Sequence, residues 1–155
     1  MASRKVSNRE ASAYVNRTRE FVTHTGSIYG RWEDIGTGET DRMRKALYVV
    51  YSYGSHHPLY VFERSTGKWY RNTEKYSSTT SRHLTQAHPG VECEDIATTE
   101  EMMALAEGGV LHLIEMREWQ RKRMEYIETA QSNARAFAQS MQQIKDALIS
   151  TTQKT

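Results

Sequence analysis

Hydrophobic and polar positions along this chain follow two different patterns, and the change falls near Thr98. Before Thr98, short apolar runs alternate with glycine, proline and polar residues, which is typical of strands; the clearest runs are residues 46–53 (ALYVVYSY), 59–64 (LYVFER) and 68–72 (KWYRN). After Thr98, apolar residues recur at steps of three and four, as on one face of a helix. The pattern predicts an α+β fold, with a small antiparallel sheet over about residues 27–72 followed by one or two C-terminal helices.

The same pattern assigns the segments around the strands. Near the N-terminus, residues 8–23 can form a short helix with Asn8 as its N-cap, or belong to a polar arm. Residues 73–97 are polar and rich in turn-forming residues, which predicts a loop. The chain therefore divides into four expected segments: an N-terminal arm or short helix (1–25), an antiparallel β core with a polar loop (26–97), a C-terminal helical oligomerisation region (98–150) and a disordered tail (151–155).

The C-terminal region begins with a helix-start signal. Two threonines and two glutamates at 98–101 supply a hydroxyl N-cap and place acids in the first turn. A glycine pair at 108–109 is expected to separate a short helix (about 98–107) from a long one (about 110–150).

The long helix carries a narrow apolar stripe. Its members repeat over about five heptads: Leu113, Met116, Ile127, Ala130, Ala134, Phe137, Met141, Ile144 and Leu148. Gln120 and Arg123 occupy the same register between the two apolar groups. Such a stripe can pack on the chain's own sheet or on a partner chain. Because the sheet region is too short to cover about 55 Å of helix, we expect a homo-oligomer that assembles through this helix.

The strand runs on either side of residues 65–67 predict a hairpin with a three-residue loop whose glycine is left-handed. In that register Phe62 lies opposite Tyr70. Two residues further from the loop, Tyr60 lies opposite Asn72. Side chains alternate between the faces of a strand, so one face collects an aromatic and polar set suited to a ligand. Its members are Tyr60, Phe62, Tyr70 and Asn72, with Arg64 and Lys68 at the turn.

Composition adds chemistry to this face and disfavours other classes of site. Residues 51–90 hold seven aromatic residues, four of the six histidines, and five Lys and Arg against two Glu. The net charge of +2 for the whole chain is too weak by itself to indicate nucleic acid. The single cysteine, Cys93, allows no intramolecular disulfide, which fits a reducing compartment. No apolar run approaches the roughly 18–20 residues of a membrane span, so we expect a cytoplasmic protein without membrane contact.

The polar stretch 77–83 (SSTTSRH) is a second candidate for ligand contact. Its hydroxyls and backbone N–H groups can surround an anion, with the Arg82 guanidinium as a bidentate clamp. We expect Ser81, Arg82 and His83 to contact a phosphate there.

The histidines admit two further interpretations. A metal site is disfavoured because their spacing matches no zinc pattern. A phosphoesterase could use His57 and His83 as acid and base, and His83-Leu84-Thr85 matches the His-x-Thr element of two-histidine enzymes. Those enzymes need a second such element, and the sequence has only one. We therefore expect no catalytic residue, no metal and no cofactor.

The stretch from Tyr51 to Gln86 resembles a segment of small uncharacterised proteins encoded by tailed bacteriophages. The resemblance covers about 36 residues, under a quarter of the chain, and it implies no particular activity. It rests on Tyr51–Gly54, His56 or His57, Pro58, Trp69, Tyr70, Asn72, Lys75–Ser77, Thr79–Ser81, His83 and Gln86.

The order of an antiparallel β core and C-terminal oligomerising helices is similar in layout to the Thoeris anti-defence sponges of phages. Those proteins sequester cyclic ADP-ribose-type signals without catalysis, with an aromatic residue and an Asn on the base and arginines on the phosphates. The resemblance implies that Phe62 and Asn72 contact a base. It also implies that Arg117 and Arg121, one helical turn apart, contact phosphates.

These observations predict a phage-encoded, non-catalytic protein in the cytoplasm of the bacterial host. It would bind a nucleotide-type phosphorylated ligand and so sequester a host immune signal. The prediction rests on the aromatic and cationic hairpin and on the lack of a convincing catalytic set. Two alternatives stay open: a phage protein that binds a host protein or nucleic acid, and a histidine-dependent phosphoesterase.

Overall fold

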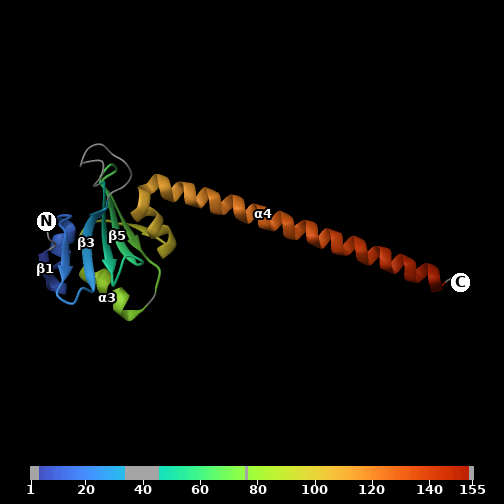
Figure 1. Ribbon diagram of the computed structural model, residues 1–155, viewed down its shortest axis with the longest axis horizontal. Helices are drawn as coiled ribbons and strands as arrows, with labels where there is room; N and C mark the ends of the chain where they lie inside the picture. The colour runs from blue at the N-terminus through green and yellow to red at the C-terminus, as the bar shows by residue number, and fades with distance from the viewer. Residues whose placement is uncertain (1–3, 34–45, 76, 154–155) are drawn as a thin grey trace. The chain divides into compact units, whose positions relative to one another are not determined.

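The computed structural model describes residues 4–33, 46–75 and 77–153. They form a seven-stranded sheet with the strands in sequence order, followed by a long helix, so the expected α+β class is confirmed (Figure 1). The strands are β1 (Arg4–Val6), β2 (Phe21–Thr23), β3 (Ile28–Glu33), β4 (Leu47–Ser52), β5 (Pro58–Glu63), β6 (Lys68–Asn72) and β7 (Glu94–Ile96). The helices are the short 3-10 helix η1 (Asn8–Glu10), α1 (Ala11–Asn16), α3 (Ser78–Gln86) and α4 (Thr99–Gln153).

The sheet is antiparallel through its centre and parallel at both edges. Strands β2 to β6 pair antiparallel in succession, whereas β1 runs parallel to β2 and β7 runs parallel to β6. The predicted antiparallel core is therefore correct for the central strands and incomplete at the edges. Both edge strands have only three residues, which limits the row of unpaired backbone groups that an edge exposes.

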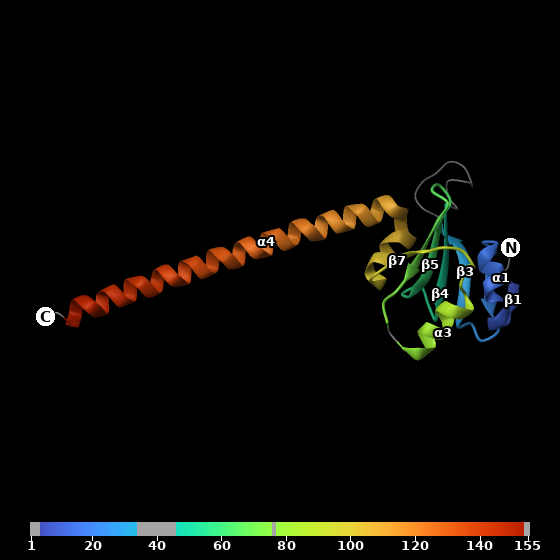
Figure 2. The same cartoon turned by 180° about the vertical axis from the view of Figure 1, so that it is seen from behind.

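The chain divides into two compact units, Met1–Met116 and Arg117–Thr155. In the first unit the sheet is covered on both faces (Figure 2). One face packs on α1 and α3 through a cluster that includes Val15, Tyr48 and Ala87. The other face packs on the first turns of α4 through a cluster that includes Val49 and Leu105. A strand buried on both faces loses its polar alternation, which is why the sequence of β4 is almost continuously apolar.

The N-terminal segment belongs to the sheet, so the prediction of an arm or a helix over 8–23 is only partly correct. Residues Ala11–Asn16 are helical, but β1 and β2 flank them. The N-cap is Ser7 rather than Asn8, because the Glu10 carboxylate accepts hydrogen bonds from the Ser7 N–H (2.9 Å) and hydroxyl (3.1 Å). The segment is mostly polar, and its few apolar residues are buried. So few apolar positions give only a weak sequence signal for the two strands.

Residues 73–97 are not a loop throughout, because they contain α3 and β7. The Ser77 hydroxyl accepts a hydrogen bond from the Thr80 N–H (3.1 Å), so the hydroxyl run begins a helix instead of forming an anion-binding turn. Only Thr80 and His83 are buried on α3. A helix with so few apolar positions gives little periodic signal, which is why the sequence did not reveal it.

The β5–β6 hairpin forms as expected, but its register differs from the prediction by one residue. Phe62 pairs with Trp69 and Tyr60 pairs with Arg71. The loop therefore has four residues, 64–67, instead of three. The glycine that ends this loop has a φ of +69°, so the expected left-handed conformation is confirmed.

The register decides which side chains share a face. A shift of one residue moves every side chain of a strand to the opposite face. Tyr70 and Asn72 therefore lie on the face opposite to Tyr60 and Phe62, and the single predicted face of four residues is wrong. The observed register sets Val61 against Tyr70, where the predicted one set Val61 against an arginine. The observed register is favoured over the predicted one because it gives apolar contacts on both faces of the sheet.

The glycine pair interrupts α4 as expected. Gly109 has φ +77° and ψ −167°, which is not helical. The carboxylate of Glu63, buried at the end of β5, accepts hydrogen bonds from the Val110 N–H (3.3 and 3.4 Å to its two oxygens) and so caps the second helical segment. At the first helix start, the Thr98 hydroxyl accepts from the Glu101 N–H (3.2 Å), as the sequence predicted.

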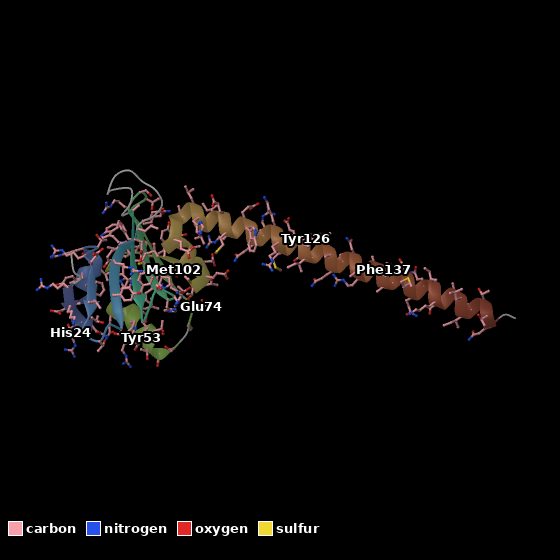
Figure 3. All side chains as sticks on the ribbon, viewed as in Figure 1. His24, Tyr53, Glu74, Met102, Tyr126 and Phe137 are labelled. Atoms are coloured by element: carbon pink, nitrogen blue, oxygen red, sulfur yellow. The ribbon has the colours of Figure 1, made fainter. Side chains whose placement is uncertain are left out.

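The second unit consists, in its described residues, of the helix from Arg117 to Gln153. Its side chains are exposed almost throughout, and Figure 3 shows Tyr126 and Phe137 projecting from the helix. The helix includes residues 151–153, so the predicted tail is wrong for these three, and residues 154–155 lie outside the described range. No helix in the described part of the chain is long and apolar enough to cross a membrane.

The apolar stripe divides between the two units. Leu113 is 2% exposed within the sheet cluster, and Met116 packs against the same cluster. At these two positions the stripe therefore packs on the chain's own sheet, which is one of the two alternatives that the sequence left open. Further along, the large stripe residues Phe137, Ile144 and Leu148 are 69%, 54% and 63% exposed. For them the homo-oligomer stays a prediction.

Candidate functional site

The structure separates the residues predicted to contact a ligand. Phe62, Arg64 and Lys68 lie near the hairpin loop; Tyr60, Asn72 and Ser81 line one cavity beside α3; Tyr70 is buried in the cluster that packs on α4; Arg82 and His83 lie on α3; Arg117 and Arg121 belong to the second unit. Those of the first unit do not form one surface, and each group has different surroundings.

The group near the hairpin loop is an aromatic surface. The ring of Phe62 lies 5.0 Å from that of Trp69 and 6.3 Å from that of Trp32. The Arg64 guanidinium lies 4.2 Å from the Trp32 ring centroid, a cation–π contact. This contact engages the Arg64 cation that a phosphate would need, together with one face of the Trp32 ring. Lys68 is exposed beside a different cavity that two glutamates line, and those carboxylates repel a phosphate.

Asn72 has its amide fully engaged. Its Nδ2 donates to the Pro58 carbonyl (3.0 Å) and to the Thr99 hydroxyl (2.9 Å), while its Oδ1 accepts from the Glu74 N–H (3.0 Å). The side chain is 1% exposed. This pattern fits a residue that fixes the chain at the end of β6, and it leaves no donor and acceptor pair to recognise a base edge.

Ser81, Arg82 and His83 point in different directions because successive residues of a helix are about 100° apart. His83 is 3% exposed, and its Nδ1 lies 2.7 Å from the Ser52 hydroxyl. Burial, helped by the positive charge of Arg82, lowers the pKa of His83, so the ring is held neutral. His83 therefore ties α3 to β4, whereas Arg82 is exposed.

Arg121 is engaged within its own helix. Its guanidinium contacts the carboxylates of Glu118 (2.6 Å) and Glu125 (2.5 Å), one turn away on either side. The hydrogen bonds and charge of Glu118 raise the pKa of Arg121. Two carboxylates around one guanidinium oppose the approach of a phosphate, so the role implied by the sponge resemblance has no support in the local charge.

The cavity beside α3 is the place where most of the predicted chemistry meets. This α3 pocket has a volume of about 370 Å³, within the size range of small-molecule sites. It is lined by Tyr60, Arg71, Asn72, Thr73, Glu74, Lys75, Ser81, Leu84, Thr85 and His88. Two cations, four hydroxyls and an imidazole thus surround one hollow, with a single carboxylate among its lining residues.

The walls of the α3 pocket are held by their own hydrogen bonds. The buried Tyr60 hydroxyl donates to the Leu84 carbonyl (2.6 Å), and burial raises the pKa of this phenol well above its ordinary range. Tyr60 is therefore a structural wall and not a free stacking ring. His88 lies in edge contact with it, with ring centroids 5.7 Å apart. The His88 Nδ1 accepts from the Gly90 N–H (2.9 Å), so the neutral ring carries its proton on Nε2 and can donate it to a ligand.

The cations of the α3 pocket come from β6 and from the residues that follow it. The Arg71 guanidinium contacts one oxygen of Asp95 (3.0 and 2.6 Å), which fixes its position and raises its pKa. Lys75 is exposed. Both were visible in the sequence as charges near the hairpin, but the predicted register set Arg71 on the face opposite to Tyr60. Thr85 and His88 were missed as pocket residues because α3 itself was missed.

No group of three or more His, Cys, Asp or Glu side chains in the described residues is arranged to hold a metal ion. Comparison with family models, with curated proteins and with solved structures found no match to this chain. The α3 pocket is thus defined by its geometry and charge alone.

Proposed function

We propose that this protein binds, without chemical turnover, a small phosphorylated ligand of nucleotide type in the α3 pocket. The observation that carries the proposal is the gathering of Lys75, the Arg71 guanidinium that Asp95 holds in place and the His88 Nε2–H around a hollow of about 370 Å³. Phosphate oxygens are acceptors that such donors bind well, and charge-assisted bonds are the stronger ones. Leu84 and the imidazole offer the apolar and aromatic surface that a base needs.

The proposal includes a biological role: a phage-encoded protein that sequesters a nucleotide signal of host defence in the bacterial cytoplasm. Its support is the resemblance of residues 51–86 to tailed-phage proteins and the layout shared with the phage sponges. We expect expression of the protein to restore phage plating on bacteria that carry a nucleotide-signalled defence. If the defence still protected the bacteria fully while the folded protein was present, this role would be contradicted. The binding proposal is tested separately, by calorimetry.

Binding is tested by calorimetry of the full chain against a panel of cyclic nucleotides and ADP-ribose derivatives. We expect at least one member to bind, and Lys75→Gln to weaken it about tenfold or more, because a hydrogen bond to a charged group contributes about 1.5–3 kcal/mol. Lys68→Gln is the matched control, since it removes an exposed lysine at the other end of β6, outside the α3 pocket. Loss of binding in Lys68→Gln with full binding in Lys75→Gln would place the ligand at the hairpin loop instead.

Two further measurements separate the alternatives. The ligand should be recovered unchanged after the protein is denatured; conversion that disappears in His83→Ala would indicate the phosphoesterase. A nucleic acid in place of a small nucleotide would show a steep loss of affinity with salt, because each neutralised phosphate releases counterions. Absence of binding across the panel by folded protein would overturn the proposal.

A further inference from the structure

The second unit presents an uncovered apolar face. All the exposed large hydrophobic side chains of the described residues lie on α4, except Tyr53 and Val91. We define the seam as the heptad positions of the second unit, 127 to 148: Ile127, Ala130, Ala134, Phe137, Met141, Ile144 and Leu148. Helices in proteins derive most of their stability from packing an amphipathic face. The seam has no packing partner among the described residues of its own unit, so a partner has to supply one.

The chemistry of the seam and its borders selects the partner. Between residues 127 and 148 the charged side chains are Glu128, Arg135, Lys145 and Asp146, and none is a seam position. The positions beside the middle of the seam are small or amide side chains, such as Gln131, Ala138 and Ser140. A strict repeat of three and four residues fits the matching repeat of another helix, in which each knob enters a hole between four residues. A second copy of this helix carries that repeat.

The distribution of side-chain size along the seam is uneven. The N-terminal half contains the two alanines, Ala130 and Ala134, whereas the C-terminal half contains Phe137, Met141 and Ile144 in succession. In a parallel pair each residue meets its own copy, so alanine would face alanine and phenylalanine would face phenylalanine. The helices would then have to approach closely at one end and separate at the other. Well-packed layers instead set large residues against small ones.

We propose that two copies of this chain associate through an antiparallel pairing of the seam. Two antiparallel registers, one heptad apart, each pair six of the seven seam positions. One sets Ala134 against Phe137 and Ala130 against Met141 of the other copy. The other sets the same alanines against Ile144 and Leu148. Either register places each alanine opposite a large side chain, and the first register also sets both Phe137 and Met141 opposite alanines. Because the flanking positions carry almost no charge, packing decides the orientation rather than ion pairs.

This inference is independent of the ligand proposed for the α3 pocket, because it uses only residues of the second unit. Its first test is the mass of the full chain by sedimentation equilibrium at micromolar concentrations. We expect a dimer for the natural sequence and a monomer for Phe137→Lys, which places a charge in the seam. Gln139→Lys adds the same charge in the same helical turn but outside the seam, so it should remain a dimer.

The orientation is tested by the distance between spin labels on identical sites of the two copies, in a Cys93→Ser background. One label pair is placed at Gln139 and the other at Ser150, both exposed and outside the seam. A parallel pair gives similar distances for both. At a rise of 1.5 Å per residue, the two antiparallel registers separate the Ser150 labels by about 33–44 Å along the axis and the Gln139 labels by only about 0–10 Å.

Three results would overturn the inference. The first is a natural-sequence protein that stays monomeric at about 100 μM while its helical circular dichroism persists. The second is a dimer that survives Phe137→Lys, which would place the contact elsewhere. The third is another kind of assembly: equal distances for the two label pairs would show a parallel pair, and a mass above that of two copies would show a larger bundle. Unchanged thermal unfolding of the sheet unit in Phe137→Lys shows that the variant is folded.

Discussion

The sheet unit and the helix unit of this protein obtain their structure by opposite means. In β4 all six residues are buried, because one set of side chains meets α1 and α3 while the other set meets the first turns of α4. From Arg117 to Gln153 almost every side chain is exposed. The first unit therefore contains its own stabilising contacts. The second has regular secondary structure almost without burial in its described residues.

Polar side chains show the same contrast. In the sheet unit they connect elements far apart in the chain: Glu63 caps the helix at Val110, and His83 contacts Ser52. In the helix unit the described polar pairs are local, as between Gln142 and Asp146 (3.0 Å). Local pairs on an exposed helix contribute little. A substitution should therefore have a large or a small effect according to the unit in which it lies.

The largest expected effect is on a buried ring of the sheet. Phe21 is fully buried, and its ring lies 6.0 Å from that of Tyr14. We expect Phe21→Ala to lower the free energy of unfolding by about 3–5 kcal/mol, measured by urea denaturation with tryptophan fluorescence as the signal. Phe137→Ala is the matched change in the helix unit, and it should leave the unfolding of the sheet unit within about 0.5 kcal/mol. Equal losses would mean that the two units unfold together.

The next effect tests how closely the sheet unit is packed. A Cβ added at Gly30 would lie 2.7 Å from the Phe21 ring and closer still to the Tyr48 hydroxyl. We expect Gly30→Ala to lower the free energy of unfolding by about 1–3 kcal/mol, because overpacking displaces neighbouring side chains. A Cβ at Gly54 meets no atom within 4 Å, so Gly54→Ala serves as the control. If Gly30→Ala left the free energy of unfolding unchanged, the sheet face under α1 would be less closely packed than the structure shows.

A smaller effect concerns the cap at the break in α4. Removing the carboxylate in Glu63→Ala leaves the Val110 N–H without this acceptor, and we expect a loss of about 1–2 kcal/mol of unfolding free energy, as for other helix caps. Glu63→Gln keeps an oxygen acceptor and should lose less. Glu118→Ala removes an exposed carboxylate of the helix unit that pairs with Arg121, and it should have no measurable effect on thermal unfolding. A larger loss of stability in Glu118→Ala than in Glu63→Ala would contradict the contrast between the units.

The smallest expected effect is a pH dependence of the sheet unit. Burial lowers the pKa values of His83 and His57 below the ordinary value of about 6.5. Below that pH the unfolded state takes up protons that the folded state does not, so stability is complete above about pH 6.5 and falls as the pH drops toward the folded pKa values. We expect thermal unfolding of His83→Gln to depend less on pH between 7 and 5. His24→Gln, at an exposed site, should keep the slope of the natural protein.

Hydrophobic pattern and glycine positions determined most of the secondary structure of this protein. The strands β3 to β6, the left-handed glycine of the hairpin and the interruption at Gly109 all follow from local preferences, because a run of β-branched or aromatic residues and a glycine with positive φ need no distant partner. The apolar heptad repeat can likewise be recognised in the sequence, since the spacing of its residues does not depend on what covers them.

Tertiary structure alone decided the register of the hairpin, the order of β1 and β7 at the edges and the existence of the α3 pocket. Loops of three and of four residues are both compatible with the sequence around Gly67, and only the burial of both sheet faces sets Val61 against Tyr70. The mostly polar α3 forms where Ala87 and His83 find a buried site. That packing brings Lys75 and His88 to one cavity although 12 intervening positions separate them in the chain, a proximity that no local pattern encodes.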